Sequence, residues 1–204
     1  AEAVLDAGGS AVLLDISETA LDRALNKLGS EYDSDKICGI AADITLRENV
    51  EKVCRDVLTK YKRIDGLINN AANNPKMEGN VANMGAIQFE NFPLQMWMDD
   101  VMVGLTGAFL CSQVFGTVMA GQKSGVILNI SSDLGIIAPD QRIYRKDGLA
   151  EKEQTIKPVT YSVIKHGLIG LTKYLATYYA EKGVRANTLC PAGVFNGQNK
   201  EFLT

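Results

Sequence analysis

Short runs of apolar residues alternate along this chain with longer segments in which apolar residues recur at helical spacing. The short runs, which have the length and composition of buried strands, are residues 10–15, 36–42, 64–72, 125–132 and 184–191. The longer segments, with helical spacing, are residues 19–28, 46–61, 94–121 and 161–181. This alternation predicts a doubly wound α/β fold, with a parallel sheet and helices on both faces.

Local signals place several helix ends. Gly29 is expected to end the helix that begins at Thr19. Thr45, with Glu48 at the capping-box spacing, is expected to cap the helix of residues 46–61. Residues 1–9 have the pattern of a helix tail closed by glycine, so we expect the sequence to start late, without an opening strand. We also expect a further strand to be missing beyond Thr204.

Tyr161 and Lys165 lie four positions apart at the start of the last predicted helix. Residues at this spacing share one face of a helix, so the phenol and the ammonium are expected to project into the same space. A nearby ammonium favours the phenolate, and a tyrosine tuned in this way can act as an acid or base near neutral pH. The same spacing also occurs in helices where the two residues are unrelated surface positions.

Ser132 ends the apolar run that precedes the Tyr161 helix, and another strand follows that helix. A strand, a helix and a second strand in this order predict a right-handed crossover in a parallel sheet. Ser132 and Tyr161 are therefore expected to meet at the carboxyl edge of the sheet, where open α/β sheets bind ligands.

Two other strand ends carry candidate binding residues. Asp15 follows a buried strand, a position from which a carboxylate can bind the ribose of a dinucleotide. The alternative is a structural role beside the helix cap, because Ser17 can cap the next helix. The small residues after Asn69 leave room for a ligand to approach the backbone, or form only a tight turn.

Residues 133–159 separate the Ser132 strand from the Tyr161 helix by an unusually long and polar connection. Connections of this length are usually functional or disordered, and this one is expected to cover the active-site edge. Its cations, which could meet an anionic substrate, are Arg142, Arg145, Lys146, Lys152 and Lys157. Its acids, which instead favour a solvated loop, are Asp140, Asp147, Glu151 and Glu153.

Composition excludes several classes of function. The 204 residues carry a net charge of −3 without a basic cluster, which argues against a nucleic-acid partner. We find no apolar tract long enough to predict a membrane span. The single histidine, His166, and four scattered cysteines offer no metal-binding cluster, and unpaired cysteines predict a cytoplasmic protein.

Six features in this order resemble the short-chain dehydrogenase/reductase family, over essentially the whole chain. They are Asp15 after a strand, Asp43-Ile44, Asn69-Asn70-Ala71-Ala72, Asn129-Ile130-Ser131-Ser132, the Tyr161/Lys165 pair and the turn at Pro191. The resemblance implies one NAD(P)-binding, Rossmann-type domain over residues 1–204, with the insertion at about 133–159. It implies hydride transfer between NAD(H) and a secondary alcohol or ketone.

The resemblance also implies roles for individual residues. Ser132 would orient the substrate oxygen, Tyr161 would exchange a proton with it, and Lys165 would favour the phenolate and hold the nicotinamide ribose. Asp15 would favour NAD over NADP, because a 2′-phosphate would meet its charge. The remaining cofactor contacts implied are Asp43 and Ile44 at the adenine, Asn70 and Ala71 along the cofactor, and Pro191, Gly193 and Val194 at the nicotinamide.

The chain departs from the family pattern at several places. The glycine-rich phosphate loop is absent and is expected before Ala1, and Gly104 stands where the family has the asparagine of its proton relay. The family's Pro-Gly turn is Pro191-Ala192 here, and its threonine falls on Asn196. The long insertion and residues 158–167 resemble a branch encoded with flagellin and surface-sugar modification genes, which suggests a sugar or nucleotide-sugar substrate, in keeping with an anionic sugar derivative.

Two alternatives to a dehydrogenase remain open. One is an epimerase or dehydratase that retains its NAD and shows no net NADH formation. The other is a catalytically silent protein that binds a cofactor or a partner, which Gly104 and the missing loop favour and the retained Ser132, Tyr161 and Lys165 disfavour. The family also implies a homodimer or homotetramer, formed through the helices of residues 94–121 and 161–181.

Overall fold

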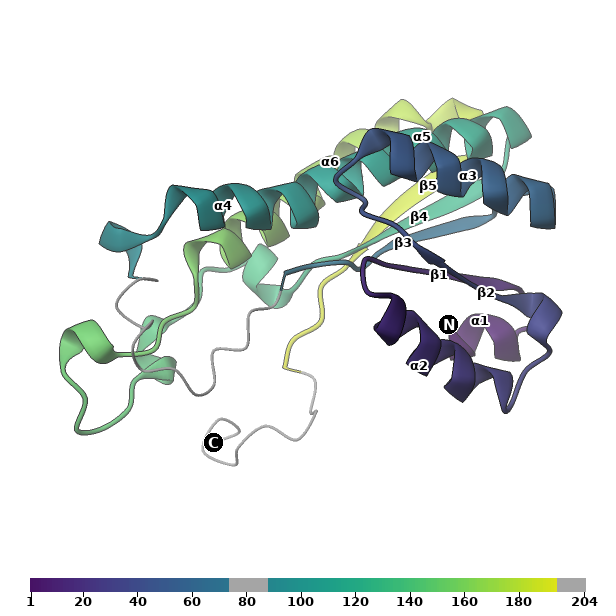
Figure 1. Ribbon diagram of the computed structural model, residues 1–204. Helices are drawn as coiled ribbons and strands as arrows, with labels where there is room; N and C mark the ends of the chain where they lie inside the picture. The colour runs from purple at the N-terminus through teal and green to yellow at the C-terminus, as the bar shows by residue number, and fades with distance from the viewer. Residues whose placement is uncertain (74–87, 194–204) are drawn as a thin grey trace.

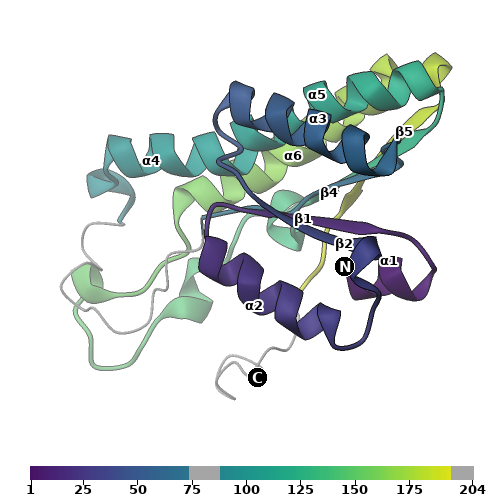
Figure 2. The same cartoon turned by 45° about the vertical axis from the view of Figure 1, so that its right-hand side comes forward.

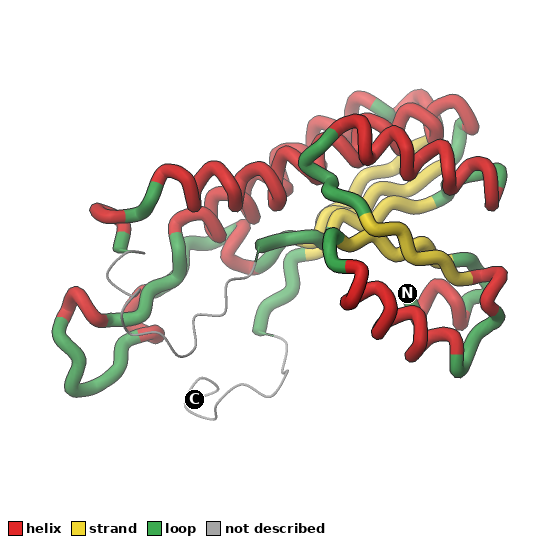
Figure 3. The backbone as a smooth tube through the Cα atoms, viewed as in Figure 1, coloured by secondary structure: helices red, strands yellow, loops and turns green. Residues whose placement is uncertain are grey.

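The computed structural model describes residues 1–73 and 88–193, in which parallel strands alternate with helices (Figures 1 and 3). The strands are β1 (Ala11–Asp15), β2 (Ile37–Ala41), β3 (Gly66–Asn69), β4 (Gly125–Ile130) and β5 (Val184–Leu189). They form two hydrogen-bonded groups, β1-β2 and β3-β4-β5, and every pair within them is parallel.

Helices lie on both faces of these strands. They are α1 (Glu2–Asp6), α2 (Glu18–Gly29), α3 (Arg47–Tyr61), α4 (Leu94–Val101), the π-helical segment η4 (Met102–Gly107), α5 (Ala108–Gln122) and α6 (Val159–Tyr178). Figures 1 and 2 show α3, α5 and α6 together on one side, and α1 and α2 on the other side of β1 and β2. The predicted doubly wound α/β fold is therefore confirmed.

Apolar side chains fill the space on each side of the strands. Met119 of α5 and Ile127 of β4 are fully buried in the larger cluster, which lies between the strands and helices α3, α5 and α6. Leu5, Ala11, Leu28 and Ile37 form a smaller cluster under α1 and α2. Residues along β1 alternate between the two clusters, as expected for a strand covered on both faces.

The cap predicted for α3 is wrong. The residue before the helix is Leu46, whose side chain caps nothing. Thr45 instead donates its backbone N–H and its hydroxyl to Oδ1 of Asp43, at 2.8 and 2.7 Å. An aspartate two residues upstream can bind the backbone in a tight turn, and this local turn replaces the capping box. The predicted end of α2 at Gly29 is confirmed.

Residues 94–122 form one continuous helical run through α4, η4 and α5. By length and composition this run is apolar enough to cross a membrane, contrary to our expectation that no tract would be. However, Cys111, Phe115 and Met119 of α5 are buried in the larger cluster. The apolar character of this run is accounted for by a core helix, because a helix packed on several sides needs apolar residues around much of its surface.

Buried polar side chains connect the larger group of strands to two helices. Asn69, Asn129 and Thr188 lie opposite one another on β3, β4 and β5. Asn69 Nδ2 donates to Asn129 Oδ1 at 2.7 Å and to Ser112 Oγ of α5 at 3.0 Å. Asn129 Nδ2 donates to Thr172 Oγ1 of α6 at 2.7 Å, and Thr188 Oγ1 donates to the same oxygen at 2.7 Å. This network fixes where α5 and α6 sit on the strands.

Replacing Asn129 with Ala should lower the free energy of unfolding by about 1–3 kcal/mol, because Asn69 Nδ2 and Thr172 Oγ1 would each lose one hydrogen bond in a buried place. Urea unfolding measures the change. Asn187→Ala is the matched control, since Asn187 is exposed on β5, and it should change stability by less than about 0.5 kcal/mol. Equal losses in the two variants would contradict a structural role for the network.

Candidate functional site

The carboxyl ends of the five strands bring the sequence-predicted residues to one edge. Asp15 ends β1, Asp43 and Ile44 follow β2, and Asn70 and Ala71 follow β3. Ser132 follows β4, and Pro191 and Gly193 follow β5; Val194 and Asn196 lie outside the described residues. The insertion lies on this same side of the strands (Figure 1). Open α/β sheets bind ligands at this edge, so it is the candidate site.

Tyr161 and Lys165 lie on one face at the start of α6, as the spacing predicts. The Lys165 ammonium nitrogen is 5.6 Å from the centre of the Tyr161 ring. It donates to the backbone oxygen of Ile130, the last residue of β4, at 2.8 Å. Burial, together with the positive charge of Lys157, lowers the pKa of the Lys165 ammonium below its usual range. The strand end thus orients the lysine toward the candidate site.

Ser132 is buried beside this pair, in a segment that docks on α6. Ser131 Oγ donates to the backbone oxygen of Lys165 at 2.7 Å, and the N–H of Asp133 donates to the backbone oxygen of Pro191 at 3.1 Å. The hydroxyl of Ser132 donates to Asp133 Oδ1 at 2.7 Å and accepts from the N–H of Leu134 at 3.2 Å. The Ser132 hydroxyl therefore has a carboxylate partner that sequence analysis missed.

Asp15 takes part in the turn before α2, and its side chain is exposed. Its Oδ1 accepts from the N–H of Ser17 at 2.8 Å, and Ser17 caps α2 by accepting from the N–H of Ala20 at 3.2 Å. The Asp15 side chain is nevertheless exposed at the end of β1, which leaves its carboxylate accessible to a ligand. The N–H of Ala42 donates to the backbone oxygen of Asp15 at 3.0 Å, so the loop after β2 lies beside the end of β1.

The other cofactor-side residues differ in accessibility. Asn70, Ala71 and Gly193 are exposed at the strand ends, and a Cβ built on Gly193 would meet nothing within 4 Å. Ile44 instead packs into the core, where a Cβ on Gly107 would lie 2.6 Å from its Cδ1. Asn70, Ala71 and Gly193 are therefore accessible to a ligand, whereas most of the Ile44 side chain packs against the core.

Asp100 of α4 joins two parts of the site and was missed in the sequence. It accepts from the hydroxyl of Thr160, which is buried at the start of α6, at 2.6 Å. Its other oxygen accepts from Asn73 Nδ2, in the loop after β3, at 3.3 Å. These bonds fix the start of the Tyr161 helix relative to the loop that carries Asn70 and Ala71.

The insertion places one of its cations directly on Tyr161. Short helical turns interrupt this mostly irregular segment (Figure 3). Arg142 and Arg145 are exposed and pair with Asp140 and Glu151, as the solvated-loop alternative expects. The Lys157 ammonium nitrogen, in contrast, lies 3.6 Å from the centre of the Tyr161 ring. Only the folded chain reveals this contact, because no local pattern distinguishes Lys157 from the other cations.

Tyr144 is a further insertion residue close to the site. Burial raises the pKa of its phenol, and the charges of Tyr161 and Asp133 act in the same direction. The insertion therefore contributes Tyr144 and Lys157 around Tyr161, and the charge of Asp133 reaches both of them.

Metal binding finds no support in the described part of the chain. No group of three or more His, Cys, Asp or Glu residues is arranged there to hold an ion. His166 is exposed, with Nδ1 2.9 Å from the backbone oxygen of Ser162.

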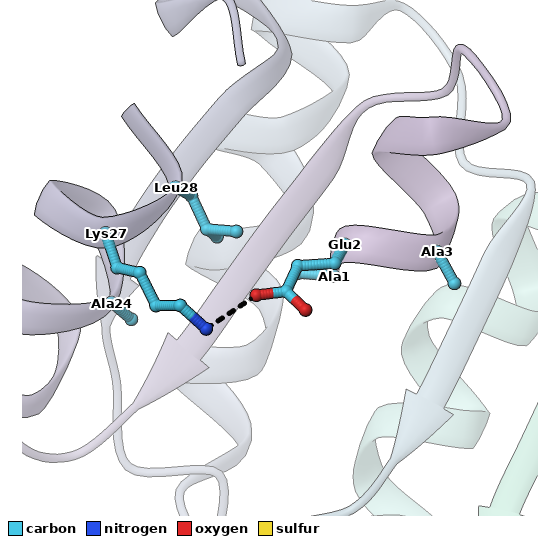
Figure 4. A pocket seen from close by; sticks show the side chains of 6 residues that line it. All are labelled: Ala1, Glu2, Ala3, Ala24, Lys27 and Leu28. Carbon is cyan, nitrogen blue, oxygen red and sulfur yellow. Dashed lines mark hydrogen bonds and ion pairs between the residues drawn. The ribbon is translucent and has the colours of Figure 1, made fainter. Parts of the chain in front are cut away.

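A separate pocket lies between α1 and α2, and Figure 4 shows its lining. The pocket is lined by Ala1, Glu2, Ala3, Ala24, Lys27 and Leu28. Glu2 and Lys27 form an ion pair across it at 2.8 Å, and both side chains are exposed. None of the candidate site residues lines this pocket, so we assign it no part in the site.

Comparison with known proteins identifies the family. Residues 1–202 match the family model described as enoyl-(acyl carrier protein) reductase. A short-chain dehydrogenase/reductase of Gibberella zeae is 32% identical over 97% of this chain. The chain belongs to the short-chain dehydrogenase/reductase family. The predicted membership is therefore confirmed.

Two other short-chain dehydrogenase/reductase relatives are informative. The post-translational flagellin modification protein A of Campylobacter coli is 28% identical over 98% of this chain, in agreement with the predicted branch. A solved short-chain dehydrogenase of Leptospira borgpetersenii, with bound NAD+, is 28% identical and superposes with a TM-score of 0.74 over 98% of this chain. The chain spans 64% of the Gibberella, 73% of the Campylobacter and 68% of the Leptospira protein.

Gly104 stands where the family resemblance predicts the asparagine of a proton relay, and the structure shows which side chain packs against it. Gly104 is buried in the π-helical segment η4, where backbone hydrogen bonding departs from the α-helical pattern. A Cβ on this residue would lie 2.8 Å from Cγ2 of Ile164 on α6. Ile164 directly precedes Lys165 on α6 and is buried. An asparagine therefore does not fit here without displacing Ile164.

Gly104→Ala should lower the free energy of unfolding by about 1–3 kcal/mol, because the new methyl group overlaps the side chain of Ile164. Thermal or urea unfolding measures the loss. Gly170→Ala is the control: Gly170 is exposed within α6 and has no atom near a new Cβ, so this change should stabilise the protein by up to about 1 kcal/mol. A Gly104→Ala variant as stable as the parent protein would contradict the close packing.

Proposed function

We propose that this protein transfers a hydride between NAD(H) and a secondary alcohol or ketone. The observation that carries the proposal is the placement of Tyr161 and Lys165 on one face of α6, beside the Ser132 segment at the carboxyl edge of the strands. Membership of the short-chain dehydrogenase/reductase family supports the same chemistry.

In this proposal, side chains of the protein transfer the proton, and the cofactor transfers the hydride. In the reductive direction, the Tyr161 hydroxyl donates a proton to the carbonyl oxygen as that oxygen becomes an alcohol; in oxidation, the phenolate accepts it. Lys165 favours the phenolate through its positive charge. Ser132 orients the substrate oxygen once its hydroxyl turns away from Asp133, since a serine hydroxyl has only one proton to donate. NAD, when bound, supplies or receives the hydride.

Asp15 is the residue that we propose for cofactor selection. Its exposed carboxylate at the end of β1 fits the adenosine ribose diol of NAD and repels the 2′-phosphate of NADP. The NAD+-bound Leptospira relative supports this choice of cofactor. Asn70, Ala71, Pro191 and Gly193 would line the rest of the cofactor, and Val194 stays a prediction.

We also propose a substrate class, a cellular location and an oligomeric state. A flagellin-modification relative supports a sugar or sugar derivative as substrate. All four cysteines are free, which supports the cytoplasm. Exposed apolar residues on the two helices of the proposed homo-oligomer interface support that assembly: Leu94, Met98, Met102, Phe109, Val163, Tyr174 and Tyr178.

Tyr161→Phe should lower kcat by about 100- to 10,000-fold, because the variant loses the group that exchanges the proton. The measurement is NADH formation or consumption with a panel of sugar alcohols and their ketones, together with the Kd for NADH, which should stay unchanged. Tyr174→Phe is the control, because Tyr174 is exposed farther along the same helix and should keep full activity.

Full turnover by the Tyr161→Phe variant would contradict the proposed role. Conversion of a substrate without net NADH change in the parent protein would instead favour an epimerase or dehydratase. Binding of neither NADH nor NADPH would favour a catalytically silent protein.

Asp15→Asn should reduce the preference for NADH over NADPH about 10-fold, because it removes the charge that repels the 2′-phosphate. The asparagine keeps an oxygen that can accept from the N–H of Ser17, so the local turn should persist. The two Kd values are measured by nicotinamide fluorescence. Ser17→Ala weakens the cap of α2 while leaving the Asp15 charge, so it should leave the preference unchanged. An unchanged preference in Asp15→Asn would exclude Asp15 as the selecting residue.

A further inference from the structure

The insertion holds Lys157 in a fixed place at the start of the Tyr161 helix. The Gln141 side chain makes two hydrogen bonds to the backbone of Lys157, accepting from its N–H at 2.9 Å and donating to its carbonyl oxygen at 3.2 Å. Pro158, which fixes its own backbone angle, follows at once and precedes α6. Lys157 is therefore positioned by the fold, although it belongs to a mostly irregular segment.

The ammonium of Lys157 faces the candidate site. It lies 3.6 Å from the centre of the Tyr161 ring, at the distance of a cation–π contact. Lys157 is half-buried, and burial lowers the pKa of its ammonium. A contact of this kind holds the charge beside Tyr161 without neutralising it.

Lys157 differs from the two arginines of the insertion in having no carboxylate bound to it. Arg142 and Arg145 each pair with an acid of the insertion, and Lys165 donates to a backbone oxygen. Within residues 1–73 and 88–193, Lys157 forms no ion pair. Asp133 is the acid whose charge acts on it, but Asp133 Oδ1 already accepts from Ser132 and Leu134. A part-buried cation without a paired anion is costly, and a bound anion offsets that cost.

We propose that Lys157 binds an anionic group of the substrate, and that the substrate is therefore a polyhydroxy acid or a sugar phosphate and not a neutral polyol. This inference rests on the proposed function, because it takes Tyr161 as the residue that meets the reacting oxygen. The anion lies only a few bonds from that oxygen, since the ammonium stands over the ring of Tyr161 itself. Lys157 thereby selects the substrate, while Lys165 serves Tyr161 and the cofactor.

The test compares Lys157→Met, which keeps the length of the side chain and removes its charge, with Lys157→Arg, which keeps the charge. Steady-state rates with NAD are measured for D-gluconate, D-sorbitol 6-phosphate and D-sorbitol. In Lys157→Met, kcat/KM for the anionic substrates should fall about 10- to 100-fold, through KM, as expected for the loss of one hydrogen bond to a charged group. Turnover of sorbitol should fall much less than turnover of the anionic compounds, and Lys157→Arg should retain part of the preference.

Arg142→Gln is the matched control, since it removes an insertion cation whose side chain is 84% exposed and paired with Asp140. It should leave the rates with all three compounds unchanged. If Lys157→Met lowers kcat equally for all three with KM unchanged, Lys157 acts on proton transfer through Tyr161 and the inference is overturned. If kcat/KM falls in Lys157→Met for only one of the two anionic compounds, that compound shows whether Lys157 binds a carboxylate or a phosphate.

A binding measurement separates failure of the inference from failure of the proposed function. Calorimetric titration with the same three compounds, with and without NADH, needs no turnover. Tighter binding of an anionic compound than of sorbitol, lost in Lys157→Met, supports the inference even if no reaction is seen. Equal binding of all three compounds to the parent protein overturns it, even if the protein oxidises sorbitol with NAD and the proposed function stands.

Discussion

The candidate site depends on the contact between the end of β4 and the first turns of α6. Lys165 donates to the backbone oxygen of Ile130, and Ser131 donates to the backbone oxygen of Lys165, so strand and helix are joined in both directions. Gly135 allows this close approach, because a Cβ there would lie 2.8 Å from that same Lys165 oxygen. Ser132 and Tyr161 are brought to one edge by this contact, although 28 residues separate them in the sequence, 133–160.

The buried polar network around Asn129 holds α5 and α6 on the strands next to this contact. Asn129 has no exposed surface and bonds to side chains on β3 and α6. Polar groups buried in this way must bond to particular partners, unlike apolar groups, which pack in many arrangements. The network therefore restricts how α6 can slide on the strands, and with it the position of Tyr161. Asp100 adds a second restraint at the start of the helix through Thr160.

The insertion brings its own charged side chains to the side of the strands where the candidate site lies. Its two arginines are neutralised within the segment, so they bring no net positive charge to the site. Gln141 instead directs one lysine inward, onto Tyr161. A second difference from the family pattern lies at Gly104. The side chain of Ile164 packs closely against this glycine, where the family pattern predicts an asparagine. The proton transfer that we propose therefore involves Tyr161 and Lys165 but no side chain at position 104.

The sequence by itself determined the alternation of strands and helices, and the strand ends at which Asp15, Ser132 and Pro191 lie. Hydrophobic periodicity reports which face of each element is buried, and spacing along a helix places Tyr161 and Lys165 together. Tertiary structure decided the partners of polar groups that lie far apart in the sequence: Asp100 for Thr160, Asn69 and Thr172 for Asn129, and the backbone oxygen of Ile130 for Lys165. These pairings depend on which side chains the folded backbone brings within a few ångströms, and the local sequence does not encode such distances.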